Sequence, residues 1–192
     1  MMIPSKYAQE GALVLPPEHE NVLTYIRDFD YTTYEHSMRV AEISKHIGNI
    51  IGITDIRLTI SAALHDIGKL HIPKSILNKD SKLSDKEFDI IKLHPTLGNI
   101  IAESHNIKDD SILRGIYEHH ERYCGGGYPN SIDSDDIHIY ARIIAIADVY
   151  DALTSKRCYK DKLTQTSTIQ YMISDKGHFD PYILHTFLKS IR

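Results

Sequence analysis

Residues 139–154 read IYARIIAIADVYDALT, a segment that is apolar nearly all round a helical projection. A helix without a polar face is buried by its neighbours, so this segment predicts the central helix of an all-helical protein. Asp148 lies within it, and no residue nearby in the same helix offers its carboxylate a cationic partner. A buried carboxylate is costly unless it is paired or bound to a metal ion. Asp148 is therefore the first candidate for a functional site.

Helical spacing of apolar residues continues on both sides of this segment. We expect further helices near residues 18–28, 36–50, 54–68, 84–94, 110–120, 165–174 and 181–191, and loops at residues 1–16, 70–83 and 124–129. Gly52 is expected to end a helix, and Pro95 to interrupt or restart one. The sequence predicts one all-α bundle of about seven to nine helices, with a lead-in and first helix at residues 1–30 and the main domain at residues 31–192.

The composition, 42% hydrophobic and 25% charged residues over 192 positions, is that of a soluble globular protein. The longest apolar run, residues 143–147, is too short to span a membrane, and no signal peptide is evident, so a cytoplasmic location is predicted. A formal net charge of −4 argues against binding of nucleic acid polymers. The two cysteines, Cys124 and Cys158, have no metal-binding or disulfide spacing.

The sequence holds twelve histidines, and several of them alternate with aspartates at regular intervals. In chain order this set is His36, His65, Asp66, His94, His119, His120 and Asp148. With each adjacent pair taken as one position, the intervals are 29, 28, 25 and 28 residues, the length of one helix and one connection. Each member alone has an ordinary structural explanation, such as a core histidine or a solvated helix end. Together they indicate helices that point into a common metal centre, where imidazole and carboxylate suit iron, manganese or zinc.

Four segments carry a resemblance to a known family: AALHDIGK at residues 62–69, HHER at 119–122, GYP at 127–129 and IAIADVYDALTSKR at 144–157. With the ordered histidines, they resemble the HD-GYP branch of the HD phosphohydrolase superfamily over about residues 32 to 190. The resemblance implies a helical fold around two or three metal ions, usually iron or manganese. It also implies hydrolysis of cyclic di-GMP to linear pGpG, and sometimes onward to GMP.

The resemblance also implies roles for particular side chains. The metal ligands would be His36, His65, Asp66, His94, His119, His120 and Asp148. Asp66 and Lys69 would be catalytic. Asp66 would be the carboxylate that bridges two ions, and Lys69, one helical turn after His65, would also bind substrate through a phosphate oxygen. Arg157 and Lys160 match phosphate-binding positions, and Tyr128 would pack on the substrate or bond to its phosphate.

The sequence departs from the family pattern at four positions. Thr32 stands four residues before His36, where three-metal members carry Glu, so two divalent ions are expected, iron or manganese before zinc. The side chains of adjacent residues on a helix point in different directions, so His120 would lie beside the metals or contact substrate rather than bind a metal ion in the same way as His119. Cys124 replaces a usual Asp in the loop before Tyr128. The other two departures are His71 in place of Gly and Cys158 in place of Pro.

Two alternatives stay open at this point. One is a catalytically weak HD-GYP module that binds cyclic dinucleotide, or a partner protein through its Gly-Tyr-Pro loop. The other is a general HD nucleotide phosphohydrolase, which the loop around Tyr128 and the pair Arg157 and Lys160 disfavour. The complete set of metal ligands favours the enzyme over the binding module.

Overall fold

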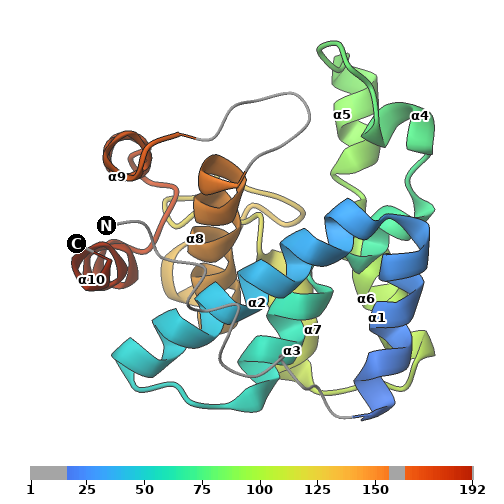
Figure 1. Cartoon of the computed structure of the whole chain (residues 1–192), viewed down its shortest axis with the longest axis horizontal. Helices are drawn as coiled ribbons and strands as arrows, with labels where there is room; N and C mark the ends of the chain where they lie inside the picture. The colour runs from blue at the N-terminus through green and yellow to red at the C-terminus, as the bar shows by residue number, and fades with distance from the viewer. Residues whose placement is uncertain (1–16, 156–162, 192) are drawn as a thin grey trace.

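The computed structural model describes residues 17–155 and 163–191, and these ranges contain helices and connections without a β-strand (Figure 1). The all-α prediction is confirmed. The helices, of which η2 and η3 are 3-10 helices, are α1 (Pro17–Phe29), α2 (Tyr31–Ile51), α3 (Ile56–Leu64), η2 (Ile67–His71), α4 (Lys74–Leu77), α5 (Asp85–Ile91), α6 (His94–Ser104), α7 (Asp110–Glu118), η3 (Ser134–Asp136), α8 (Ile139–Thr154), α9 (Gln165–Ser174) and α10 (Pro181–Ser190).

Helix α8 lies at the centre of the bundle, as its apolar sequence predicts. Ile143, Ile144, Ile146 and Ala147 are fully buried there. Helices α2 and α7 pack directly on α8, and α3 packs on both of them. Helices α9 and α10 flank α8 on one side, while α4 and α5 project from the far end of the molecule (Figure 1). Within the described ranges, no helix combines the length and apolarity that crossing a membrane requires.

Short polar side chains set where these helices begin. Asp30 accepts a hydrogen bond from the backbone N–H of Thr32 at 3.1 Å and caps the start of α2, and Gly52, with φ 87°, is the C-cap residue that follows its last residue, Ile51. Asp55 caps α3 in the same way through the N–H of Arg57 at 3.0 Å. Such caps satisfy backbone donors that the first helical turn leaves free. The predicted end of α2 at Gly52 is confirmed.

Two connections differ from the sequence expectation. Helix α3 ends at Leu64, so the predicted pair at 65–66 lies beyond the helix rather than on it. The expected loop at 70–83 includes the last residues of η2 and the short helix α4. Pro95 restarts the chain as expected, because α5 ends at Ile91 and α6 begins at His94. A proline in a first helical turn sacrifices no helical hydrogen bond.

Contact between η2 and α6 brings the sequence-distant positions 66 and 94 together. Gly68 lies so close to α6 that a Cβ atom there would be 1.9 Å from the carbonyl oxygen of His94 and 2.6 Å from the backbone nitrogen of Gly98. Only a residue without a side chain permits this approach. The glycine after the His-Asp pair therefore has a packing role that positions the backbone of His94.

We predict that Gly68→Ala lowers the free energy of unfolding by about 1–3 kcal/mol, because backbone atoms must move to admit the methyl group. Chemical denaturation measures this. The matched control is Gly98→Ala, in which the new Cβ meets the side chain of Ile116 at 2.9 Å rather than backbone. The control should cost less, since a side-chain methyl can shift. Equal stability of Gly68→Ala and the unchanged protein would contradict the prediction.

Candidate metal centre

Three buried histidines share one local arrangement. The Nδ1 atoms of His65, His94 and His119 lie 2.7, 2.8 and 2.7 Å from the carbonyl oxygens of the residues three positions earlier. His65 and His119 stand at the C-terminal caps of α3 and α7, and the carbonyl that His94 contacts belongs to the last residue of α5. Helix ends leave such carbonyls without partners. A carbonyl can only accept, so in the neutral form of each ring Nδ1 carries the proton and Nε2 keeps its lone pair.

These Nε2 atoms converge. The Nε2 atoms of His94 and His119 are 3.2 Å apart, and that of His94 is 3.4 Å from Oδ1 of Asp66. The buried Nε2 of His65 has no hydrogen-bond partner. Lone pairs that face one another in a water-poor interior repel, and a buried acceptor without a partner is costly. The donor set therefore fits a divalent cation, which would accept all these lone pairs.

The structure brings all seven predicted ligands to one place. They include two groups whose ligand atoms each lie within 4.8 Å of one another, His94, His119 and His120 in one and His36, His65 and Asp66 in the other. Asp148 lies beside the second group, with Oδ1 3.0 Å from Nε2 of His36. Asp66 stands between the groups, because Oδ2 is 3.8 Å from His36 while Oδ1 faces His94. Both groups offer nitrogen and oxygen donors that suit a metal ion.

The expectation that His120 diverges from His119 is wrong. Helix α7 ends at Glu118, so the pair lies in a turn, where the two rings stay 4.1 Å apart between centroids. The ring of Tyr128 stacks on His120 at 4.7 Å with an interplanar angle of 29°. Burial, with the negative charges of Asp66 and Asp148, raises the pKa of the Tyr128 hydroxyl. The Gly-Tyr-Pro loop thus covers the imidazole group directly.

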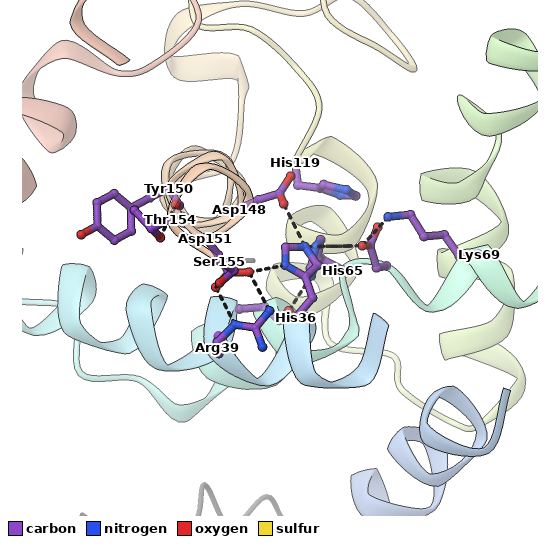
Figure 2. A network of polar contacts seen from close by, with 12 residues as sticks. His36, Arg39, His65, Lys69, His119, Asp148, Tyr150, Asp151, Thr154 and Ser155 are labelled. Carbon is purple, nitrogen blue, oxygen red and sulfur yellow. Dashed lines mark hydrogen bonds and ion pairs between the residues drawn. The ribbon is translucent and has the colours of Figure 1, made fainter. Parts of the chain in front are cut away.

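His36 is held differently, between two aspartates of α8 (Figure 2). Its Nε2 faces Asp148, and its Nδ1 is 2.7 Å from Oδ2 of Asp151. Burial by itself would lower the pKa of His36, but hydrogen bonds to Asp148 and Asp151 outweigh burial and raise it to about 9. Burial would raise the pKa of Asp148, but its hydrogen bond to His36 holds that pKa below the ordinary value.

In the group formed by His94, His119 and His120, the pKa values are lowered, in contrast to the raised pKa of His36. Burial lowers the pKa of His94 to about 4, and burial with repulsion from His94 lowers that of His120 to about 3. Burial also lowers the pKa of His119 well below its ordinary value. These rings are neutral at physiological pH, which is the form that binds metals.

Lys69 reaches the centre, with Nζ 2.6 Å from Oδ2 of Asp66 (Figure 2). Burial would raise the pKa of Asp66, but Lys69 and His65 outweigh burial and lower it well below the ordinary value. Thr32 is exposed, and its hydroxyl donates to Asp30. The remaining predicted positions lie away from this network or outside the described residues: His71 and Cys124 are exposed, and Arg157, Cys158 and Lys160 fall outside the described ranges.

Among the buried carboxylates that sequence reasoning missed, two contact the candidate centre or the loop that covers it. Asp151 follows Asp148 by one turn of α8, a spacing that could have marked it as a second inward-facing group. Glu121 is 2% exposed, and its Oε1 accepts hydrogen bonds from the backbone N–H groups of Asn130 and Ser131 at 2.7 and 3.0 Å. Glu121 thereby fastens the segment after the Gly-Tyr-Pro loop to the turn that carries the paired histidines. Nothing in the sequence marked that contact except its place in HHER.

An NMR pH titration of metal-free protein should show two classes of histidine. His36 should titrate at about pH 9, whereas His94 should stay neutral down to about pH 4. The folded-state pKa of His36 lies above that of an unfolded histidine, ~6.5. Its contribution to stability is therefore complete below that pH and is lost as the pH rises through about 9. Titration of His36 at its ordinary value would show that Asp148 and Asp151 do not stabilise its charge.

Comparison with known proteins identifies a family and several relatives. The family model described as HD domain matches residues 25–183. A cyclic di-GMP phosphodiesterase of Pseudomonas aeruginosa is 34% identical over 172 residues, which are 88% of this chain and 42% of the relative. A 3'3'-cGAMP-specific phosphodiesterase of Vibrio cholerae is 36% identical over 162 residues, 82% of this chain and 31% of the relative. The chain therefore spans less than half the length of these curated relatives.

The fold is also found among solved structures. An HDG"Y"P protein from Bdellovibrio bacteriovorus superposes with a TM-score of 0.68 at 20% identity, covering 90% of this chain and 60% of that chain. At this identity the likeness concerns the fold alone. The family match covers most of the chain and includes every residue of the candidate centre. The chain belongs to the HD domain family, as its motifs predicted.

Proposed function

We propose that this chain hydrolyses a phosphodiester bond of a cyclic dinucleotide, with cyclic di-GMP as substrate and linear pGpG as the product. The observation that carries the proposal is the convergence of unprotonated Nε2 atoms with the carboxylates of Asp66 and Asp148 at one place. The relatives named as cyclic di-GMP and 3'3'-cGAMP phosphodiesterases support the substrate class.

The centre would hold two divalent ions, iron or manganese. One position is offered by His36, His65, Asp66 and Asp148, and the other by His94, His119, His120 and Asp66. When bound, such ions activate water as a nucleophile and stabilise negative charge on phosphoryl oxygens. Position 32 offers no carboxylate to a third ion, because Thr32 is exposed and its hydroxyl donates a hydrogen bond to Asp30.

Substrate would be held by side chains around the ions. The Lys69 side chain is 28% exposed, so its ammonium is positioned both to neutralise Asp66 and to donate to a phosphate oxygen. Tyr128 covers His120 with one face of its ring and would pack a base or the ribose against the other. Arg157 and Lys160 remain proposed phosphate contacts on the sequence resemblance alone.

A second substrate, 3'3'-cGAMP, is favoured by the specificity named for the V. cholerae relative. The test is anaerobic purification with Fe²⁺ or Mn²⁺, followed by product analysis on cyclic di-GMP, 3'3'-cGAMP and a nucleoside triphosphate. We expect turnover of a cyclic dinucleotide, and loss of both metal and turnover in Asp66→Ala. Binding without turnover would support the weak binding module, and turnover of the triphosphate alone would support a general nucleotide phosphohydrolase. Full metal occupancy in Asp66→Ala would remove that residue from the ligands.

We predict that Lys69→Ala retains its metals and loses about 2–4 kcal/mol of transition-state stabilisation in kcat/KM, the contribution of a charge-assisted contact in a dry site. Removal of a cation beside Asp66 should leave metal affinity unchanged or raise it. Steady-state kinetics and metal analysis measure both. Lys86→Ala, on the exposed surface of α5, is the control and should behave as the unchanged protein. Unchanged kinetics of Lys69→Ala would exclude a phosphate contact.

A further inference from the structure

One histidine of the centre cannot be oriented by a helix end. His36 lies in the second turn of α2, where the neighbouring carbonyl oxygens already accept hydrogen bonds within the helix. The histidines at 65, 94 and 119 each donate to a free carbonyl at the end of a helix. His36 therefore needs an acceptor from another element, and Asp151 of α8 supplies it at 2.7 Å.

We propose that Asp151 is a positioning residue that keeps the proton of His36 on Nδ1 and so makes Nε2 the metal ligand. This inference rests on the proposed metal centre and names a residue that the ligand set does not contain. Asp148 and Asp151 are three residues apart on α8, so the two carboxylates lie on one face of the helix. Asp148 faces Nε2 of the ring and Asp151 faces Nδ1, which distinguishes the two nitrogens.

Asp151 is itself held in a single orientation. Its carboxylate is 3% exposed and accepts from Nε of Arg39 at 2.7 Å on Oδ1 and from the second guanidinium nitrogen at 3.1 Å on Oδ2. The hydroxyl of Ser155 donates to Oδ1 at 2.7 Å. Arg39 follows His36 on α2, and Ser155 follows Asp151 at the end of α8 (Figure 2). These contacts hold the Asp151 carboxylate in the orientation in which it accepts from Nδ1 of His36.

A carboxylate partner also changes the ligand chemically. An imidazole that donates to an anion is a stronger donor through its other nitrogen than one that donates to a carbonyl. Without Asp151 the ring could rotate and place Nδ1 toward Asp148, which would present the wrong nitrogen to the metal. Loss of such an outer partner typically weakens metal affinity by ~10–100-fold.

The test measures Zn²⁺ affinity by chelator competition, without substrate, in the unchanged protein, Asp151→Ala and Asp151→Asn. We expect ~10–100-fold weaker binding of one ion in Asp151→Ala and a smaller loss in Asp151→Asn, which keeps an acceptor oxygen for Nδ1. Nitrogen NMR of labelled histidine in the Zn²⁺ form should find the His36 proton on Nδ1 in the unchanged protein and in Asp151→Asn. Asp151→Ala should lose that signature.

Asp180→Asn is the matched control. Asp180 is also buried, caps α10 and accepts from Arg142 at 3.1 Å, yet it is absent from the contacts of His36. The control should lower the melting temperature without changing Zn²⁺ affinity or the His36 signature. Equal affinity and the same His36 signature in all variants would overturn the role of Asp151, and so would an affinity loss in Asp180→Asn as large as in Asp151→Asn. If the unchanged protein binds no divalent ion, the proposed metal centre itself fails. Asp151→Asn keeps the test available if Asp151→Ala does not fold.

Discussion

The hydrogen bond from an imidazole Nδ1–H to a carbonyl at the end of a helix is the interaction on which the centre depends. It satisfies a backbone acceptor that the helix leaves free, and it leaves Nε2 unprotonated. Three helices that end toward the same point therefore deliver three lone pairs to it. The bundle is arranged around those ends, with α8 at its centre and the contact between η2 and α6 setting the distance between two of them.

Much of this arrangement could be predicted from local sequence. The apolar circumference of α8 predicted its burial, and the regular intervals identified all seven groups that meet at the centre. The end of α3 at Leu64 was not predictable in the same way, and neither was the packing of the following η2, where Gly68 lies against the backbone of His94. That contact joins residues with no local pattern in common, so periodicity and capping rules contain no information about it.

The same limit explains the residues that sequence reasoning missed. His36 and Asp151 are separated by 115 positions, and only the packing of α2 on α8 brings them to hydrogen-bond distance. Glu121 satisfies backbone N–H groups of a loop whose course is fixed by tertiary contacts. Conversely, the rule that adjacent helical residues diverge was sound but did not apply to His120, since the helix had already ended.

The facing Nε2 atoms of His94 and His119 make the stability of the folded protein depend on whether a cation is bound. Without a cation, their repulsion is a cost that the folded state bears and the unfolded chain does not. Any ion that binds there stabilises the native state by mass action, in proportion to the logarithm of its free concentration. Metal supply would then set the fraction of molecules open to proteases, so that a shortage of metal lowers the abundance of the protein as well as its activity.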